Sequence, residues 1–369
     1  TYDEALNMDI RGCHETGVRA NEVSTATGYV NALKAVEYVF SNGFDSRTDK
    51  QFGLKTGELK DLKTFDDFYS AVLKQWESLI EMTIDVSLQY EKYLSFINPS
   101  NMYSATIEGA LKKGCDAYQN GVKFNNSAIL NCGFASLVDA VMAVKEFVYD
   151  KKSVTLEILA KALAANWNGF EDLHTQIVKS PHKYGNDDEE TNRYTEAMSS
   201  YFMSKVNNRP NARGGVYKAI MHSALQFVLQ GKKTGATPDG RYAGDEISKN
   251  GSPSVGMDRE GVTALIKSAL KARPYTYCES FCLDVMLHPS AVNGDDGLEI
   301  MKSLLFMYMK NGGQSIQFNV FNADTLRDAQ KHPDKYKNLQ VRVCGWNVLW
   351  NNLSKDEQEA YIKRAENIK

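Results

Sequence analysis

The chain has 369 residues, of which 43% are hydrophobic and 24% are charged, and 43 Lys and Arg residues against 46 Asp and Glu residues give a formal net charge of −3. This composition is ordinary for a globular protein, and the small net charge disfavours nucleic acids and membrane surfaces as partners. The most apolar stretch, 128–144, is interrupted by Asn131 and Asp139. It falls short of the ~20 uninterrupted apolar residues that span a bilayer, so we expect no membrane-spanning helix.

Cysteine usage indicates the compartment. The six cysteines are scattered along the chain, and residues 1–20 carry no signal-peptide pattern. So few cysteines in a chain of this length are not the disulfide framework of a small secreted domain. We therefore expect free thiols and a cytoplasmic location.

Helical periodicity is the strongest structural pattern. In 65–93, for example, Phe68, Val72 and Trp76 recur at four-residue steps, which predicts a long helix facing the core. In chain order, we expect helices at 28–41, 65–93, 127–148, 155–165, 171–179, 188–206, 217–230, 259–270, 296–312, 323–332 and 354–367. We expect short strands at 281–286, 314–321 and 339–343. Helices that alternate with strands indicate an α/β fold, and no linker or internal repeat divides the chain.

Two short glycine-centred segments carry the strongest functional signal: 11–15 (Arg-Gly-Cys-His-Glu) and 341–347 (Val-Arg-Val-Cys-Gly-Trp-Asn). The second, followed by 353–358 (Leu-Ser-Lys-Asp-Glu-Gln), resembles the radical loop and following helix of the glycyl radical enzymes, the superfamily of pyruvate formate-lyase. The first is similar to the Gly-Cys-x-Glu loop of that family. Further segments resemble stretches that the family carries in the same order: 183–188, 231–241, 288–290 and 317–320.

Radical chemistry explains why such a pair needs a glycine and a cysteine. A radical on a glycine Cα is delocalised over the neighbouring amide nitrogen and carbonyl, and the missing Cβ lets the centre flatten. Gly345 would store the radical, and the thiol of Cys13, 332 positions earlier, would relay it to a substrate. Taken singly, Gly345 would fit a turn glycine and Cys13 an inert loop thiol. The flanking residues favour the radical pair.

The neighbours of the pair have different expected roles. Glu15 lies two residues from Cys13, so in an extended loop both side chains face the same side. Its carboxylate would act as general acid and base on the substrate. We interpret His14, which faces the other way, as a polar or packed neighbour, and Cys344 as a small packing residue.

Three other patterns are weaker candidates for a ligand site. Cys278, Cys282 and His288 lack a Cys-x-x-Cys pair, which disfavours a metal site. Residues 231–241 lack the spacing of a phosphate-binding loop, so turns explain their glycines better. Residues 187–188 could bind a cation, but helix N-capping is the simpler account. We therefore predict no metal ligand and no cofactor-binding residue.

The resemblance implies a fold and a division of the chain. The family fold is a ten-stranded α/β barrel made from two antiparallel five-strand halves, with the cysteine loop between the halves and the glycine loop reaching in from the C-terminal side. The chain is expected to hold the cysteine loop and second half-barrel in 1–310, and the glycyl radical domain in 311–369. An N-terminal segment or a separate chain would supply the first half, and the complete barrel is expected to form a homodimer.

The resemblance also implies an activity. A radical S-adenosylmethionine activating enzyme would install the radical on Gly345, with no cofactor left bound. Pyruvate formate-lyase uses two adjacent cysteines, from which Cys13 and His14 depart, whereas Cys-x-Glu matches dehydratases, C–N and C–S lyases and arylacetate decarboxylases. We expect an oxygen-sensitive lyase of anaerobic metabolism that acts by elimination on a small organic substrate. A decarboxylase, a formate acetyltransferase-like C–C lyase and a non-catalytic radical-domain subunit are the alternatives.

Overall fold

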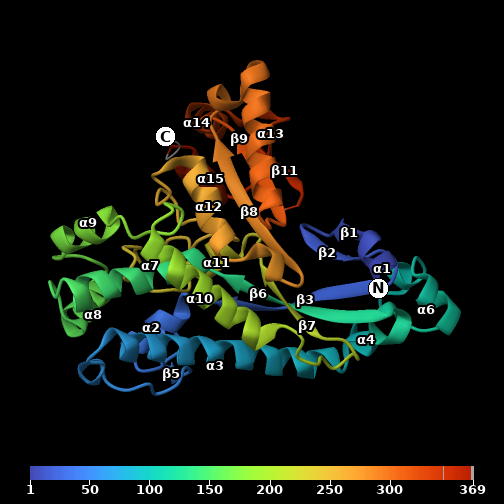
Figure 1. The fold of residues 1–369 in the computed structure, drawn as a ribbon, viewed down its shortest axis with the longest axis horizontal. Coiled ribbons are helices and arrows are strands. Elements are labelled where there is room, and N and C mark those ends of the chain that lie inside the picture. Colours follow the sequence, from blue (N-terminus) through green and yellow to red (C-terminus); the bar gives the residue numbers. More distant parts are fainter. Residues whose placement is uncertain (344, 367–369) are drawn as a thin grey trace.

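The computed structural model describes residues 1–343 and 345–366. A five-stranded parallel sheet lies at the centre of the fold (Figure 1). Its strands are neighbours in the order of the chain: β3 (Glu22–Asn31), β6 (Phe124–Cys132), β7 (Tyr217–Met221), β8 (Ser280–Leu287) and β9 (Ser315–Val320). Parallel neighbours need crossover connections, and helices lie in each of them.

The pairing between neighbouring strands is uneven. β3 and β6 share nine residue pairs, and β8 and β9 share six. β7 and β8 share only two, Ile220 with Ser280 and Met221 with Phe281. The sheet therefore has two parts, β3-β6-β7 and β8-β9, which join at a short seam.

Helix α3 (Phe65–Glu91) runs under β3 along the molecule (Figure 1). It begins at a capping box, in which Thr64 and Asp67 satisfy each other's backbone N–H groups. Its inward face buries Trp76, whose ring stacks on Phe202 at 5.6 Å between centroids. The apolar face that the sequence pattern indicates in α3 therefore packs against α10 (Glu189–Val206), which carries Phe202.

The remaining α-helices are α1 (Tyr2–Leu6), α2 (Lys34–Phe40), α4 (Leu94–Ile97), α5 (Asn101–Ser104), α6 (Glu108–Lys113), α7 (Phe134–Val144), α8 (Leu156–Ala164), α9 (Glu171–Lys179), α10 (Glu189–Val206), α11 (Gln226–Gly231), α12 (Gly261–Lys271), α13 (Gly294–Lys310), α14 (Ala323–Lys331) and α15 (Lys355–Glu366). Three hairpins pair β1 (Met8–Arg11) with β2 (Glu15–Val18), β4 (Phe44–Asp45) with β5 (Lys50–Gln51), and β10 (Gln340–Arg342) with β11 (Asn347–Leu349).

Most expected elements are confirmed. The structure has helices α3, α8, α9, α10, α12, α13, α14 and α15, and strands β8, β9 and β10, at the expected places with ends moved by a few residues. Residue 367, the last of the expected C-terminal helix, lies outside the described residues.

Three predictions were wrong at their N-terminal ends. Residues 28–31 belong to β3, 127–132 belong to β6, and 217–221 form β7, where the sequence indicated the starts of helices. In β6 every residue after Phe124 is buried. A parallel strand that is buried on both faces shows no alternation, so periodicity cannot separate it from a buried helix. Gly133, at φ +77°, marks the true boundary between β6 and α7.

The C-terminal part of the chain has a small core of its own. The buried side chain of Trp350 packs with Val341 and Ile362, which joins the β10–β11 hairpin to α15. Arg327 on α14 binds α15 through two glutamates, at 2.6 Å from Glu359 and 2.9 Å from Glu366. The expected boundary between residues 310 and 311 stays a prediction.

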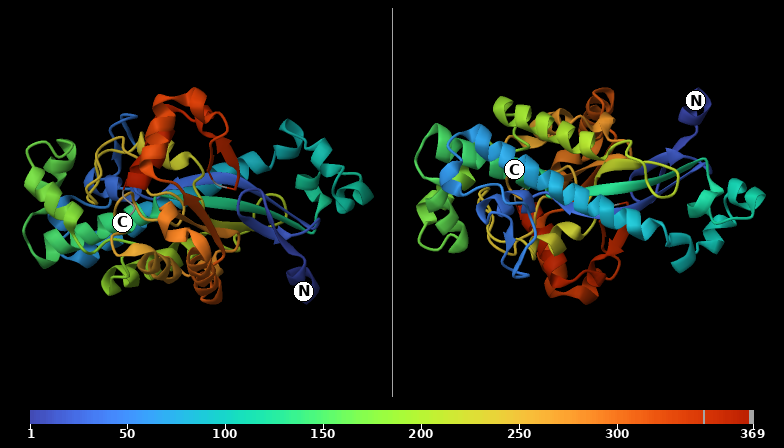
Figure 2. Two further views of the ribbon diagram at one scale, coloured as in Figure 1. Left: turned by 90° about the horizontal axis from the view of Figure 1, so that it is seen from above. Right: turned by 90° about the horizontal axis from the view of Figure 1, so that it is seen from below.

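Seen from above and below, the molecule is elongated, with α4 to α6 (teal) at one end and α8 and α9 (green) at the other (Figure 2). Among the described residues, β3 and β9 are the edges of the central sheet, and each pairs with one neighbour in it. None of the helices in 1–343 and 345–366 combines the length and the apolar character needed to cross a membrane.

Candidate active site

Two hairpin turns from opposite ends of the chain meet. Cys13 lies in the turn between β1 and β2, and Gly345 lies in the turn between β10 and β11. A Cβ built on Gly345 would overlap Cys13 Cα and lie 2.5 Å from Cys13 Cβ, a separation that real Cβ atoms do not show. Gly345 also has φ +79°, a conformation that favours glycine. The structure thus brings together the two residues that the sequence paired, and only a glycine fits against this cysteine.

Glu15 closes the turn that carries Cys13. Its Oε2 accepts hydrogen bonds from the backbone N–H groups of Cys13 at 2.6 Å and His14 at 3.0 Å. A Cβ on Gly12, which has φ +58°, would come within 2.7 Å of the same carboxylate oxygen. The carboxylate therefore lies directly beside the cysteine backbone, while its Oε1 is not bound by any residue that the structure describes.

His14 points away from Glu15 and is buried, at 6% exposure. Its Nδ1 lies 2.6 Å from Ser315 Oγ, and its Nε2 lies 3.0 Å from Gln317 Oε1. Both partners are on β9. The interpretation of His14 as a buried polar neighbour is confirmed, and its contacts attach the cysteine turn to the last strand of the sheet.

The strand that leads to Gly345 is held from several sides. The carbonyl oxygen of Val343 accepts from Lys249 Nζ at 2.7 Å and from Gln317 Nε2 at 3.3 Å. Asn319 forms two hydrogen bonds with the backbone of Arg342, which also accepts from the hydroxyl of Tyr361 at 2.8 Å. β9 therefore contacts both hairpins, through Ser315 and Gln317 on one side and Gln317 and Asn319 on the other.

A cluster of opposite charges supports the base of the cysteine hairpin. Arg11, Glu22, Lys218 and Glu279 form it, and Glu279 is fully buried. Burial raises the pKa of Glu279, although Lys218 and Arg11 oppose the rise. Burial acts the same way on Glu22, but Lys218 and hydrogen bonds hold the pKa of Glu22 below its usual value. No sequence motif marks this cluster, because its members stand in the sequence as separate charged residues near apolar segments.

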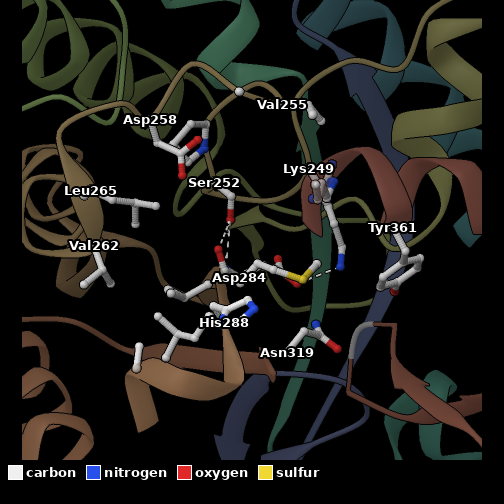
Figure 3. Close-up of a pocket in the computed structure, with 18 of the residues that line it drawn as sticks. Lys249, Ser252, Val255, Asp258, Val262, Leu265, Asp284, His288, Asn319 and Tyr361 are labelled. Atoms are coloured by element: carbon white, nitrogen blue, oxygen red, sulfur yellow. Dashed lines mark hydrogen bonds and ion pairs between the residues drawn. The ribbon is translucent and has the colours of Figure 1, made fainter. Parts of the chain in front are cut away.

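A cavity of about 440 Å³ lies beside the residues that hold the glycine turn (Figure 3). Its lining includes Lys249, Asp284, Asn319 and Tyr361, together with Asp258, whose pKa is raised to about 6 by burial. Cys13, Glu15 and Gly345 are not among its lining residues. The cavity therefore borders the side chains that support the glycine turn.

The weaker candidates have structural explanations. Asp188 is the N-cap of α10 and accepts from Thr191 N, which confirms the capping interpretation. The loop 231–241 turns around the buried guanidinium of Arg241, which donates to the carbonyls of Thr234 at 3.1 Å and Asp245 at 2.7 Å. Backbone carbonyls thus occupy the cation, as expected for a turn and not for a phosphate loop.

The remaining cysteines differ in burial. Cys278 is exposed, and Cys282 is fully buried beside Asn250 and Asp284. Cys344 lies outside the described residues, so its interpretation as a packing residue stays a prediction.

Comparison with known proteins identifies the family. A family model described as pyruvate formate lyase-like matches residues 1–231, and a model described as glycine radical matches residues 247–351. The chain is 33% identical to trans-4-hydroxy-L-proline dehydratase of Clostridioides difficile over 366 residues, which are 99% of this chain and 46% of the relative. It is 30% identical to isethionate sulfite-lyase of Bilophila wadsworthia, over 99% of this chain and 45% of the relative.

Solved structures agree. The glycerol-bound B12-independent glycerol dehydratase of Clostridium butyricum matches with a TM-score of 0.91 and 30% identity, over 99% of this chain and 46% of that chain. The chain thus spans about half the length of the relatives it matches. The match confirms the expected α/β half-barrel with a C-terminal glycine radical domain. This chain belongs to the glycyl radical enzymes of the pyruvate formate lyase-like family.

Proposed function

We propose that this chain is the radical-bearing half of a glycyl radical lyase that eliminates a leaving group from a small organic substrate. The contact between Gly345 and Cys13 carries the proposal, because hydrogen-atom transfer needs the two centres side by side. The relatives named above include dehydratases and a sulfite-lyase, so elimination is favoured over decarboxylation.

The proposed chemistry uses three residues. The Gly345 radical takes the hydrogen atom of the Cys13 thiol, forming a C–H bond and leaving a thiyl radical. The thiyl takes a hydrogen atom from the substrate carbon that bears a hydroxyl group, and Glu15 takes the hydroxyl proton. The resulting ketyl-type radical expels the neighbouring leaving group, which takes the proton from Glu15 and so restores the carboxylate. The product radical then takes a hydrogen atom from the Cys13 thiol, and the thiyl takes one from Gly345, which regains its radical.

The position of Glu15 supports this role. One carboxylate oxygen is fixed on the backbone of the cysteine turn, and the other is not bound by a described residue. A carboxylate held in this way stands next to the thiol with one oxygen available to a substrate. The same anchoring keeps the base and the relay cysteine in a constant relation during turnover.

The complete enzyme needs partners. We propose that a first half-barrel, in the same or a separate polypeptide, covers the open edges β3 and β9 and supplies much of the substrate pocket. A radical S-adenosylmethionine activating enzyme would install the radical, and the complete barrel would form a homodimer. Cys13, Cys115, Cys132 and Cys278 are free thiols, which suits the reducing cytosol that we propose as the compartment.

The test is activation of the complete barrel under anaerobic conditions, followed by product analysis with a panel of 1,2-diols, hydroxy amino acids and hydroxysulfonates. Cys13→Ser should keep the electron paramagnetic resonance signal of the radical and form no product. The control is Cys278→Ser, at an exposed cysteine far along the chain. It should show the radical signal and form product like the wild type. Product formation by Cys13→Ser would refute the proposal and favour a non-catalytic radical subunit.

A further inference from the structure

Gln317 lies between the two hairpin turns. It is buried on β9, at 7% exposure. Its Oε1 lies 3.0 Å from His14 Nε2, next to Cys13, and its Nε2 lies 3.3 Å from the carbonyl oxygen of Val343, two residues before Gly345. A single side-chain amide therefore spans the neighbours of the relay cysteine and of the radical glycine.

The partners of this amide fix its orientation. Gln317 Nε2 also donates to the carboxylate of Asp284. A flipped amide would turn its oxygen toward the Asp284 carboxylate and the Val343 carbonyl, and both of these contacts would then set one acceptor against another. Gln317 Oε1 is therefore the atom that faces His14.

This orientation determines the tautomer of His14. Because Gln317 Oε1 can only accept, His14 Nε2 carries the proton. In the neutral ring Nδ1 is then the acceptor, and the hydroxyl of Ser315 donates to it at 2.6 Å. The imidazole is thus held by β9 at both nitrogens, in one ring orientation.

The glycine side of the amide belongs to a closed set of contacts. Asp284 Oδ1 lies 2.6 Å from Lys249 Nζ, and Lys249 donates to the same Val343 carbonyl at 2.7 Å. Asp284 therefore accepts from both Gln317 and Lys249, and these two side chains also donate to the Val343 carbonyl, which closes a ring of contacts. Lys249 and Gln317 are buried and the side chain of Asp284 is 8% exposed, so loss of one partner leaves a polar atom unsatisfied.

We propose that Gln317 is a positioning residue, resting on the proposed function, that fixes the cysteine turn against the glycine turn for hydrogen-atom transfer. Its hydrogen bonds in the described part of the chain go to His14, Asp284 and Val343, so it acts through the residues next to Cys13 and near Gly345. Each turn is the tip of a two-stranded ribbon, which has little rigidity alone. A displacement of about 1 Å at reacting atoms costs on the order of a hundredfold in rate, so a shared anchor on β9 has a large effect.

The experiment compares two buried glutamines of similar exposure. Gln317→Met keeps volume and removes the bridge. Gln358→Met, at 8% exposure, removes one buried hydrogen bond to the Trp350 carbonyl inside the C-terminal core and leaves the turns untouched. Both are made in the complete barrel and activated anaerobically.

The readout is deuterium exchange at the radical in D2O without substrate. Reversible transfer between Gly345 and the solvent-exchanged thiol of Cys13 replaces the Cα hydrogen, and the split radical signal collapses. Gln317→Met should slow this collapse by roughly tenfold or more with an undiminished radical yield. Gln358→Met should exchange like the wild type. Equal rates for the two variants would overturn the proposal.

A second variant keeps the proposal testable if Gln317→Met does not accept the radical. His14→Phe removes only the cysteine side of the bridge and leaves the bonds to Val343 in place. It should form the radical normally and exchange slowly, and a wild-type exchange rate would refute the bridge. Absence of exchange in the wild type would instead contradict the proposed function itself.

Discussion

The ammonium group of Lys218 lies 2.9 Å from Glu22 Oε1 and 2.7 Å from Glu279 Oε2, so one cation joins β3, β7 and the residue before β8. Arg11 of the cysteine hairpin reaches the same two carboxylates at 3.4 Å and 3.2 Å. Two cations and two anions thus form a balanced cluster below the turn that carries Cys13.

Lys218→Met should destabilise the fold by about 3 kcal/mol, because it leaves buried carboxylates with one cation fewer. Urea unfolding at neutral pH measures the change. Lys112→Met is the control, since Lys112 pairs with Glu108 on the surface, where both side chains are more than 70% exposed. It should change stability by less than ~0.5 kcal/mol. Equal losses in the two variants would contradict a structural role for the cluster.

Gly345→Ala should abolish the radical signal after anaerobic activation, for two reasons. The radical centre loses its glycine, and the added Cβ collides with Cys13. Gly244→Ala is the matched control, because Gly244 also has positive φ, +85°, but its Cβ would meet nothing within 4 Å. The control should keep the signal. In air, the activated wild type should be cut at Gly345 and release a short C-terminal fragment, visible by mass spectrometry.

Glu15→Gln should separate radical relay from acid–base chemistry. The glutamine carbonyl can still accept from the N–H groups of Cys13 and His14, so the turn keeps its shape. Deuterium exchange at the radical should therefore continue, while kcat for elimination falls by about 10²- to 10⁴-fold with loss of the base. A variant that eliminates at the wild-type rate would assign the proton transfer to another group.

Asp139 should make stability depend on pH between about 4 and 7. Burial raises the pKa of Asp139 to about 7, from an ordinary value of 3.8. The folded state therefore binds the proton of Asp139 more tightly than the unfolded state. The contribution of this group to the free energy of unfolding is greatest below pH 4 and is lost as the pH rises through 7. Asp139→Asn keeps an acceptor for Tyr184 N and should flatten this dependence.

Urea midpoints at pH 5 and pH 7.5 measure the effect. Asp67→Asn is the control, because Asp67 is an exposed N-terminal carboxylate of α3 whose pKa is lowered by hydrogen bonds with Thr64. Asp67 is ionised at both pH values, so the Asp67→Asn variant should lose the same stability at each. A pH dependence unchanged by Asp139→Asn would mean that other buried groups, such as Asp258, determine it.

The chain expressed by itself should associate through the exposed edges β3 and β9. Co-expression with a first half-barrel should restore a defined complex, with an obligate interface above ~2,000 Å². Analytical ultracentrifugation distinguishes the outcomes. A monomer that melts cooperatively without a partner would contradict the need for the other half-barrel.

The sequence was a good guide where a pattern is local. The amphipathic face of α3 and the cap of α10 are written in neighbouring residues, and both are confirmed. The sequence did not indicate β6 and β7 as strands, because burial on both faces removes the alternation that identifies a strand. β3, which the sequence also did not indicate, is only partly buried and has Tyr29 exposed. The partners of these strands are also distant in sequence, so nothing local specifies the pairing.

The candidate site divides in the same way. Cys13 and Gly345 stand in short motifs that a sequence can show. Gln317 could not be assigned a role, because its partner His14 is 303 residues away and only the fold brings them together. Lys218 and Glu279 are ordinary charges in the sequence, and their meaning comes from the short distance between β7 and β8.

The seam between β7 and β8 has a mechanical consequence. With only two residue pairs across it, the backbone ladder contributes little to holding β8 and β9 against the other three strands. The ion pair between Lys218 and Glu279 joins the two parts of the sheet, β3-β6-β7 and β8-β9. The backbone N–H of Thr16, in the cysteine hairpin, also donates to the carbonyl of Glu279 at 3.0 Å. The cysteine hairpin therefore bridges the seam between β7 and β8, where the sheet has its fewest residue pairs. A force that separates the two parts of the sheet would act directly on the turn that holds the thiol of Cys13.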